Sequence, residues 1–216
     1  MGNMEILQTI LDVFLHIDKN LAVITTQYGA LTYGILFLII FMETGLVVTP
    51  FLPGDSLLFA AGALAAMGSF GFWILYPLML VAAIVGYTVN YWIGDKFEKS
   101  VFDKGSKVFK KEYLEQAEEF YRKHGGKAIV FARFVPIIRT FAPFVAGISK
   151  MNYRDFIKYN MLGGFLWVSL FLGGGFLFGN LPVVRENFHY LVLGIIVVSL
   201  VPIFVEVSKR RKSVIK

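Results

Sequence analysis

The chain has 216 residues, of which 56% are hydrophobic and 16% aromatic, and its formal net charge is +6. Soluble domains are about 45–50% apolar even when glycine is counted, so this composition excludes an ordinary soluble domain and indicates an integral membrane protein. The sequence has no cysteine, which excludes disulfides, thiolate metal ligands and cysteine nucleophiles. We attribute the positive charge to membrane topology and expect no nucleic-acid partner.

Four segments are long and apolar enough to be transmembrane helices, which need about 20 residues each. Two further segments, 5–21 and 108–124, carry apolar residues at helical spacing among polar ones, and we expect both to lie on the membrane surface as amphipathic helices. The four predicted spans are residues 29–48, 72–93, 156–179 and 189–207.

Two other apolar segments, 49–68 and 128–149, are interrupted by prolines. Proline removes a backbone donor and clashes with the preceding turn of a helix. Irregular backbone at membrane depth is tolerated only where protein or a water-filled cavity surrounds it. We therefore predict two re-entrant helical hairpins. Pro50, Pro53 and Gly54 are expected to shape the first, with Asp55 capping the helix that follows, and Pro136 and Pro143 to shape the second.

The charge distribution supports this layout. With four spans and two hairpins, one side of the membrane holds both termini, the 94–127 loop with its nine basic residues, Lys150, Arg154 and the basic tail 208–216. The opposite side holds only Arg185. The positive-inside rule then places both termini in the cytoplasm. A six-span alternative loses the asymmetry, because Lys150 and Arg154 would cross to the other side.

The predicted fold is thus a single all-α polytopic membrane domain, built as an inverted repeat. The first repeat core is 29–93, after the N-terminal amphipathic segment 1–28, and the second is 128–180, after the cytoplasmic amphipathic segment 94–127. The last span, 189–207, precedes the tail. Inverted repeats whose broken helices meet near the midplane are typical of secondary transporters.

Four ionisable residues fall at or near the hairpins: Glu43 and Asp55 in the first repeat, Arg133 and Arg139 in the second. Each unpaired charge at the bilayer centre costs roughly 2.5–3.5 kcal/mol, so four would cost about 10–14 kcal/mol. We therefore expect carboxylates to meet guanidiniums where the hairpin tips meet. Arginine matches phosphate oxygens in bidentate fashion and buried carboxylates can carry protons, which suits an anionic head group exchanged against protons. A purely structural ion-pair cluster is the alternative.

The glycine-rich segment 163–179 is expected to pack closely against other helices, and Tyr87 and Asn90 to make interhelical hydrogen bonds. We expect no metal site, no cofactor and no enzymatic activity. The histidines His16, His124 and His189 belong to no phosphatase-like group, and no metal-ligand spacing or phosphate-binding glycine loop is present.

The stretches FMETGLVVTPFLPGDSLLFAAGALA and FARFVPIIRTFAPFVAGISKMNYRDFIKYNMLGGFLWV closely resemble the DedA family of bacterial inner-membrane proteins, part of the SNARE-associated Golgi protein superfamily. The resemblance covers roughly residues 30–180. It implies two membrane-embedded hairpins in inverted repeat, and lipid transport linked to proton-motive force. The essential acidic pair of the family would map onto Glu43 and Asp55, and the arginine pair onto Arg133 and Arg139. Where many relatives have an acidic residue this chain has Tyr87, with Asn90 three residues later.

The main functional hypothesis is a flippase in the bacterial inner membrane that moves an anionic or zwitterionic lipid between leaflets. The resemblance implies undecaprenyl phosphate or a phospholipid such as phosphatidylethanolamine as cargo. A proton-coupled ion or small-solute antiporter using the same four charges is the alternative, and a scaffold or insertion factor is a third. The sequence leaves open the cargo, the coupling ion, the direction and whether the protein is a homo-oligomer.

Overall fold

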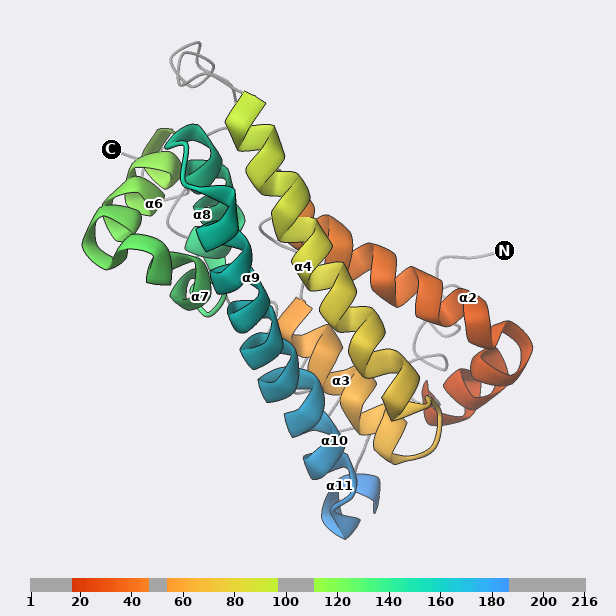
Figure 1. Ribbon diagram of the computed structural model, residues 1–216. Helices are drawn as coiled ribbons and strands as arrows, with labels where there is room; N and C mark the ends of the chain where they lie inside the picture. Colours follow the sequence, from red (N-terminus) through yellow and green to blue (C-terminus); the bar gives the residue numbers. More distant parts are fainter. Residues whose placement is uncertain (1–16, 47–53, 97–110, 187–216) are drawn as a thin grey trace, which may run out of the picture. The chain divides into compact units, whose positions relative to one another are not determined.

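The computed structural model describes residues 17–46, 54–96 and 111–186, and these residues are helical and contain no strand, as predicted (Figure 1). The helices, labelled as in Figure 1, are α2 (Ile17–Gly45), α3 (Gly54–Ala66), α4 (Phe72–Lys96), α6 (Lys111–His124), η1 (Gly125–Lys127), α7 (Ala128–Ala132), α8 (Pro136–Ile148), α9 (Tyr153–Val168), η2 (Ser169–Gly173), α10 (Gly174–Gly179) and α11 (Pro182–Glu186).

Two of these helices are long and apolar enough to cross a membrane. They are Phe72–Lys96 and the continuous run Tyr153–Gly179, in which η2 is a π-helical segment between α9 and α10. Both coincide with spans predicted at 72–93 and 156–179. The predicted span 189–207 and the basic tail lie outside the described residues.

The helix before the first predicted hairpin begins earlier than expected. The sequence predicts a surface helix over 5–21 and a separate span over 29–48, but residues 17–21 already belong to α2, which continues to Gly45. Residues 17–28 contain neither glycine nor proline, so nothing in them interrupts the helical hydrogen bonds. The apolar part of α2 is Gly29–Gly45. Residues 5–16 lie outside the described residues.

The described residues belong to two compact units. The first unit contains residues 17–33, 55–74 and 171–186, and the second contains residues 34–46, 54, 75–96 and 111–170. Every buried polar or charged side chain identified in the described residues belongs to the second unit: Glu43, Thr44, Thr88, Asn90, Arg133, Arg139, Thr140 and Asn160. The candidate site therefore lies in the second unit.

In the first unit, glycines let α3 and α10 approach closely. A Cβ at Gly175 would overlap the backbone of Phe59, and one at Gly179 would lie 2.6 Å from the Cα of Ala63. The rings of Phe59 and Phe178 lie 6.0 Å apart across the same contact. The packing role predicted for the glycine-rich segment is thus confirmed at these two positions.

In the second unit, α4 and α9 are apolar on their outward faces as well as inside. On α9, Phe156, Asn160, Gly163, Gly164 and Trp167 are buried at helical spacing, whereas Met161, Leu162, Phe165 and Leu166 are exposed. On α4, Val81, Val85 and Trp92 are exposed in the same way. A soluble helix would place polar residues on that side, so these faces are suited to contact with lipid.

The second predicted hairpin, 128–149, is a pair of short helices, α7 and α8, joined by a turn at 133–135. The turn follows from Pro136, which occupies the first position of α8 and restricts the residue before it to an extended conformation. Val135 accordingly has φ −118° and ψ 108°. Pro143, also predicted to shape this hairpin, lies inside α8, and the helix continues past it.

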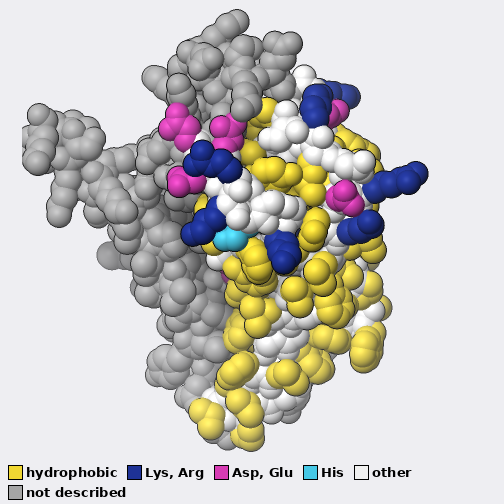
Figure 2. Space-filling model, turned by 60° about the vertical axis from the view of Figure 1, so that its left-hand side comes forward, with side chains coloured by type: hydrophobic (Ala, Val, Ile, Leu, Met, Phe, Trp, Pro, Cys, Tyr) yellow, Lys and Arg dark blue, Asp and Glu magenta, His cyan; other side chains and the backbone are white. Residues whose placement is uncertain are grey.

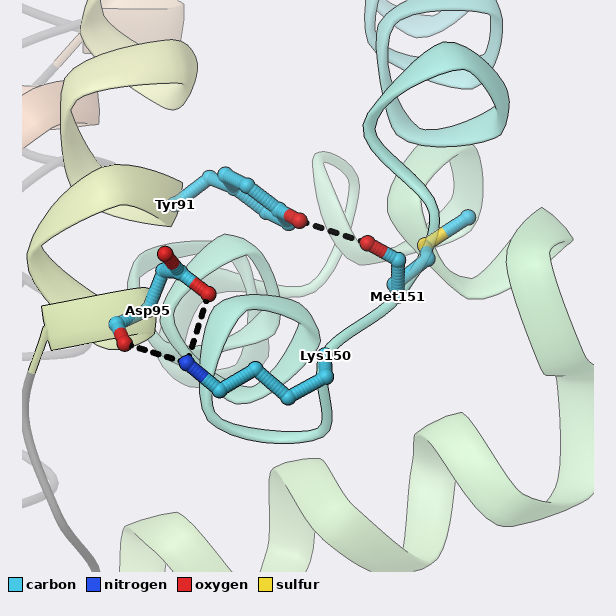
Figure 3. A network of polar contacts seen from close by, with 4 residues as sticks. All are labelled: Tyr91, Asp95, Lys150 and Met151. Atoms are coloured by element: carbon cyan, nitrogen blue, oxygen red, sulfur yellow. Dashed lines mark hydrogen bonds and ion pairs between the residues drawn. The ribbon is translucent and has the colours of Figure 1, made fainter.

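The far end of α8 is held to α4 by a polar network (Figure 3). Lys150 has a left-handed backbone, φ 53°, and its Nζ donates to the backbone oxygen of Asp95 at 2.7 Å and to Oδ1 at 2.8 Å. The Tyr91 hydroxyl donates to the carbonyl of Met151. These contacts fix the turn between α8 and α9 against the end of α4.

The amphipathic helix predicted over 108–124 is described from Lys111 to His124. It is followed by Gly125, whose φ of 57° lies in the left-handed region that favours glycine. The side chain of Tyr121 packs against the apolar cluster Phe141, Phe144 and Val145 of α8. On the face shown in Figure 2, charged side chains gather over one region and hydrophobic side chains cover the surface beside it, the separation expected at a membrane boundary.

Candidate functional site

The structure brings two of the four predicted site residues into direct contact. Glu43 lies in the last turn of α2, and Arg139 lies one turn into α8. Arg139 Nη1 is 3.2 Å from Glu43 Oε1, and both side chains are almost fully buried. A helix from the first predicted repeat and a helix from the second thus meet through an ion pair.

The second arginine has a different environment from the one we expected. Arg133 directly follows α7 and is 1% exposed, and among the described residues no carboxylate lies within ion-pair distance of it. Its Nη2 donates to the backbone oxygen of Ala83 at 3.2 Å and to Oδ1 of Asn160 at 2.7 Å. Its guanidinium carbon lies 3.8 Å from the ring centroid of Tyr87. Neutral hydrogen-bond acceptors and a π face replace the predicted carboxylate.

Arg133 keeps donor groups to spare. The two hydrogens of Nη2 match its two acceptors, whereas Nε and Nη1 are buried and have no hydrogen-bond partner in the described part of the chain. These two nitrogens carry three N–H groups. Buried donors without a partner cost about 1–3 kcal/mol each or more when charged, and they are common at functional sites.

Tryptophan stands beside both cations. The ring of Trp167, in α9, has its centroid 5.8 Å from the guanidinium carbon of Arg133 and 5.9 Å from that of Arg139. At these distances the indole π face interacts favourably with positive charge. The two arginines therefore share one aromatic neighbour, although only Arg139 is paired with Glu43.

Gly54, in the segment predicted as the first hairpin, makes a tight contact with Glu43. A Cβ at Gly54 would overlap the carboxylate of Glu43, so only glycine fits there while Glu43 keeps its position. Asp55 is the next residue; it belongs to the first unit and lies in the first turn of α3. Asp55 was predicted to cap this helix, and the structure places it as the second residue of α3, after Gly54. Pro50 and Pro53 lie outside the described residues.

Asn90 makes the interhelical hydrogen bonds predicted for it. Its Nδ2 donates to the backbone oxygen of Thr44 at 3.2 Å and to that of Thr140 at 2.9 Å. Thr44 follows Glu43 in α2, and Thr140 follows Arg139 in α8. One amide on α4 thus joins the two backbones that carry the ion pair.

Sequence reasoning missed Asn160 and Trp167. Asn160 is fully buried in α9, where it accepts from Arg133 and donates to α4. The signal available was a single amide within the apolar span 156–179, and polar side chains inside a span usually face the protein interior. Trp167 gave no separate signal, because aromatic residues are frequent throughout this chain.

The donor set is suited to anions. Guanidinium groups donate hydrogen bonds and cannot ligate a metal ion, and the described residues contain no group of three or more histidine, cysteine or acidic side chains that could hold one. Arg133 offers N–H groups in a buried, low-dielectric environment, where charge-assisted hydrogen bonds to an oxyanion are strong. Glu43 pairs with Arg139, and a proton bound to its carboxylate would remove the charge that holds this ion pair.

Comparison with known proteins identifies the family. Residues 52–177 match the family model described as VTT domain. The chain is 51% identical over 213 residues to "Protein DedA" of Escherichia coli K12, a match that covers 97% of each chain. It is 42% identical over 165 residues to an uncharacterized membrane protein of Mycobacterium leprae, covering 76% of this chain and 74% of the relative. It is 35% identical over 184 residues to "Inner membrane protein YqjA" of Escherichia coli K12, covering 83% and 82%.

No solved structure matches the chain. The family model spans more than half of the chain, and the match to Protein DedA runs almost from end to end. The apolar outward faces of α4 and α9 agree with the membrane location stated in the names of these relatives. The chain belongs to the DedA family of VTT-domain membrane proteins.

Proposed function

We propose that the protein is a transporter of the bacterial inner membrane that moves a phosphate-bearing lipid from one leaflet to the other. The observation that carries the proposal is Arg133, a buried cation whose Nε and Nη1 donors have no partner among the described residues. A phosphate group would satisfy those donors and balance the charge. Undecaprenyl phosphate and phospholipids such as phosphatidylethanolamine are the cargoes that family membership suggests.

The surroundings of Arg133 support a lipid as the molecule that carries this phosphate. Exposed apolar side chains occur in α7 (Phe131) and in the turn that follows it (Phe134 and Val135), and the outward face of α9 is also apolar. A polar head group at Arg133 would thus lie within an apolar shell suited to acyl or prenyl chains. Because Arg133 is 1% exposed here, the lipid enters only when the surrounding helices separate.

The ion pair supplies a way to couple such movement to protons. Breaking a buried pair by removing one charge costs about 3–5 kcal/mol, so protonation of Glu43 would favour a different arrangement of α2 and α8. Asp55, in the first turn of α3, is the second candidate proton carrier. In this proposal protons and lipid act on neighbouring charges, and the protein catalyses no covalent step.

The test is transport by purified protein in vesicles. Undecaprenyl phosphate or phosphatidylethanolamine is placed in one leaflet, and its appearance in the other is followed by a membrane-impermeant phosphatase or amine reagent, with and without a pH gradient. We expect wild-type protein to accelerate movement and Arg139→Ala to abolish it. Equal rates in vesicles with wild-type protein, with Arg139→Ala and without protein would refute the proposal.

A proton-coupled antiporter of an ion or small solute is the second candidate, favoured by the buried Glu43–Arg139 pair. A pH-sensitive dye inside the same vesicles separates the two. Proton flux that needs an added cation and is indifferent to lipid composition would favour the antiporter. Proton flux that needs the phosphate-bearing lipid would favour the lipid transporter.

A further inference from the structure

The hydrogen bond from Arg133 to Asn160 is as short as a bond to a carboxylate, but the acceptor carries no charge. The Nη2–Oδ1 distance between Arg133 and Asn160 is 2.7 Å, which is typical of charge-assisted hydrogen bonds. Aspartate has nearly the same shape as asparagine and would pair with the guanidinium in the same place. An amide at this point therefore holds the cation without neutralising it.

The hydrogen bonds of Asn160 show that an amide, rather than a carboxylate, fits this position. Its Nδ2 donates to the backbone oxygen of Ile84 at 3.0 Å and to Thr88 Oγ1 at 3.2 Å. The Thr88 hydroxyl gives its own hydrogen to Ile84 O, at 2.8 Å. With Nδ2 facing these two acceptors on α4, only Oδ1 remains to face Arg133. A carboxylate would have no hydrogen for Ile84.

The other side chains in direct contact with Arg133 are also neutral and leave its remaining donors uncovered. The ring of Tyr87 covers one face of the guanidinium at 3.8 Å. Gly163, on α9, leaves room for the Arg133 side chain, because a Cβ at this position would crowd Arg133 Nε at 3.2 Å. The cation is thus fixed by α4 and α9 while its Nε and Nη1 stay without partners in the described chain.

We propose that Asn160 is a positioning residue that sets the anion selectivity of the site: it fixes the Arg133 guanidinium without neutralising it, so that an oxyanion such as a phosphate monoester head group completes the charge balance. This inference rests on the proposed function and gives the two arginines different roles. Arg139 pairs with Glu43, and Arg133 binds the ligand.

The test measures charge preference in the full-length protein in phosphatidylcholine nanodiscs. The probes are farnesyl phosphate and farnesol, two lipids with the same chain that differ in the phosphate. For Asn160→Asp we expect the preference for farnesyl phosphate to fall at least about thirty-fold, because altering a buried charge partner changes binding by 2 kcal/mol or more. Farnesol affinity should not change. Asn160→Ala, which removes this support of Arg133 without adding a charge, should lower the preference by less than Asn160→Asp does.

The outcomes separate this inference from the proposed function. If wild-type protein shows no preference for farnesyl phosphate, the proposed function fails together with the inference. If wild-type shows the preference and Asn160→Asp keeps it, only the inference is overturned. An equal loss of both probes in Asn160→Asp would mean a structural role and would also overturn it.

A second pair of variants is informative should Asn160→Asp not fold. Arg133→Gln removes the cation that we assign to the ligand, and Arg139→Gln removes the one paired with Glu43. We expect Arg133→Gln to abolish the preference for farnesyl phosphate and Arg139→Gln to reduce it less. A full preference in Arg133→Gln would overturn the proposal.

Discussion

Asn90→Ala is the sharpest test of how the charged site is held together. Asn90 is fully buried, and its two hydrogen bonds join the backbone of α2, next to Glu43, to that of α8, next to Arg139. Alanine removes both donors and adds no charge. We expect the variant to be less stable and to transport more slowly, because the two halves of the ion pair lose their common support.

The size of the effect follows from the contacts. Hydrogen bonds between membrane helices average about 0.6 kcal/mol and reach about 1.7 kcal/mol, so the two give about 1–3 kcal/mol. Thr44 lies one residue before the end of α2, where carbonyls lack intrahelical partners, and leaving its oxygen unsatisfied adds about 1–3 kcal/mol. The sum is about 2–6 kcal/mol, which lowers Tm by about 4–24 °C for a chain of this size.

The assay is thermal unfolding in detergent, followed by circular dichroism at the helical minimum. Asn180→Ala is the matched control, because the exposed Asn180 side chain donates to Phe176 O within its own helical segment. Surface substitutions of this kind change stability by about 0.5 kcal/mol or less, and hence Tm by no more than about 2 °C. If Asn90→Ala melts together with wild-type protein and the control, the bridge does not support the site.

Three further predictions concern the surroundings of the site. Gly54→Ala should abolish transport, because its methyl group would displace the Glu43 carboxylate, whereas Gly173→Ala, with open space around its Cβ, should be silent in the same vesicle assay. Asp95→Asn should leave transport intact and lower the free energy of unfolding by no more than about 1 kcal/mol, because the ion pair of Asp95 with Lys150 is exposed. A larger loss of stability, or a loss of transport, would contradict this. Burial raises the pKa of Tyr121, so the stability gained by burying the neutral phenol is complete below the ordinary tyrosine pKa and is lost as pH rises through the pKa of the folded state. Tyr121→Phe should remove this loss of stability at alkaline pH. The same dependence of unfolding on high pH in the variant and in wild-type protein would contradict the prediction.

The elements that the sequence predicted well are those encoded by a local pattern. The spans at 72–93 and 156–179 follow from uninterrupted apolar composition, and the turn before α8 follows from the restriction that Pro136 places on its predecessor. Pro143 imposes the same restrictions on the backbone as Pro136, but it lies inside a helix rather than at its start. A single proline removes one helical hydrogen bond, and a helix surrounded by protein tolerates that loss.

The site was predictable in its charges but not in its pairing. Electrostatic cost alone indicated that Arg139 needs an acidic partner, and Glu43 is in contact with it. The same argument failed for Arg133, because its partners are neutral and come from distant positions: Ala83 lies 50 residues away in the chain, and Asn160 lies 27. A sequence does not show which backbone carbonyl will accept a side-chain hydrogen bond, and a single amide in an apolar span does not show which charged residue it will contact.

The position of Trp167 gives the site a built-in optical signal. The chain has three tryptophans, and Trp73 and Trp92 are 85% and 52% exposed, whereas Trp167 is 1% exposed and lies within 6 Å of both guanidinium carbons. An indole in dry surroundings emits at shorter wavelength than one in contact with water. With phenylalanine at the two exposed positions, the emission colour of the unlabelled protein would report when water or a head group enters between the arginines, turnover by turnover.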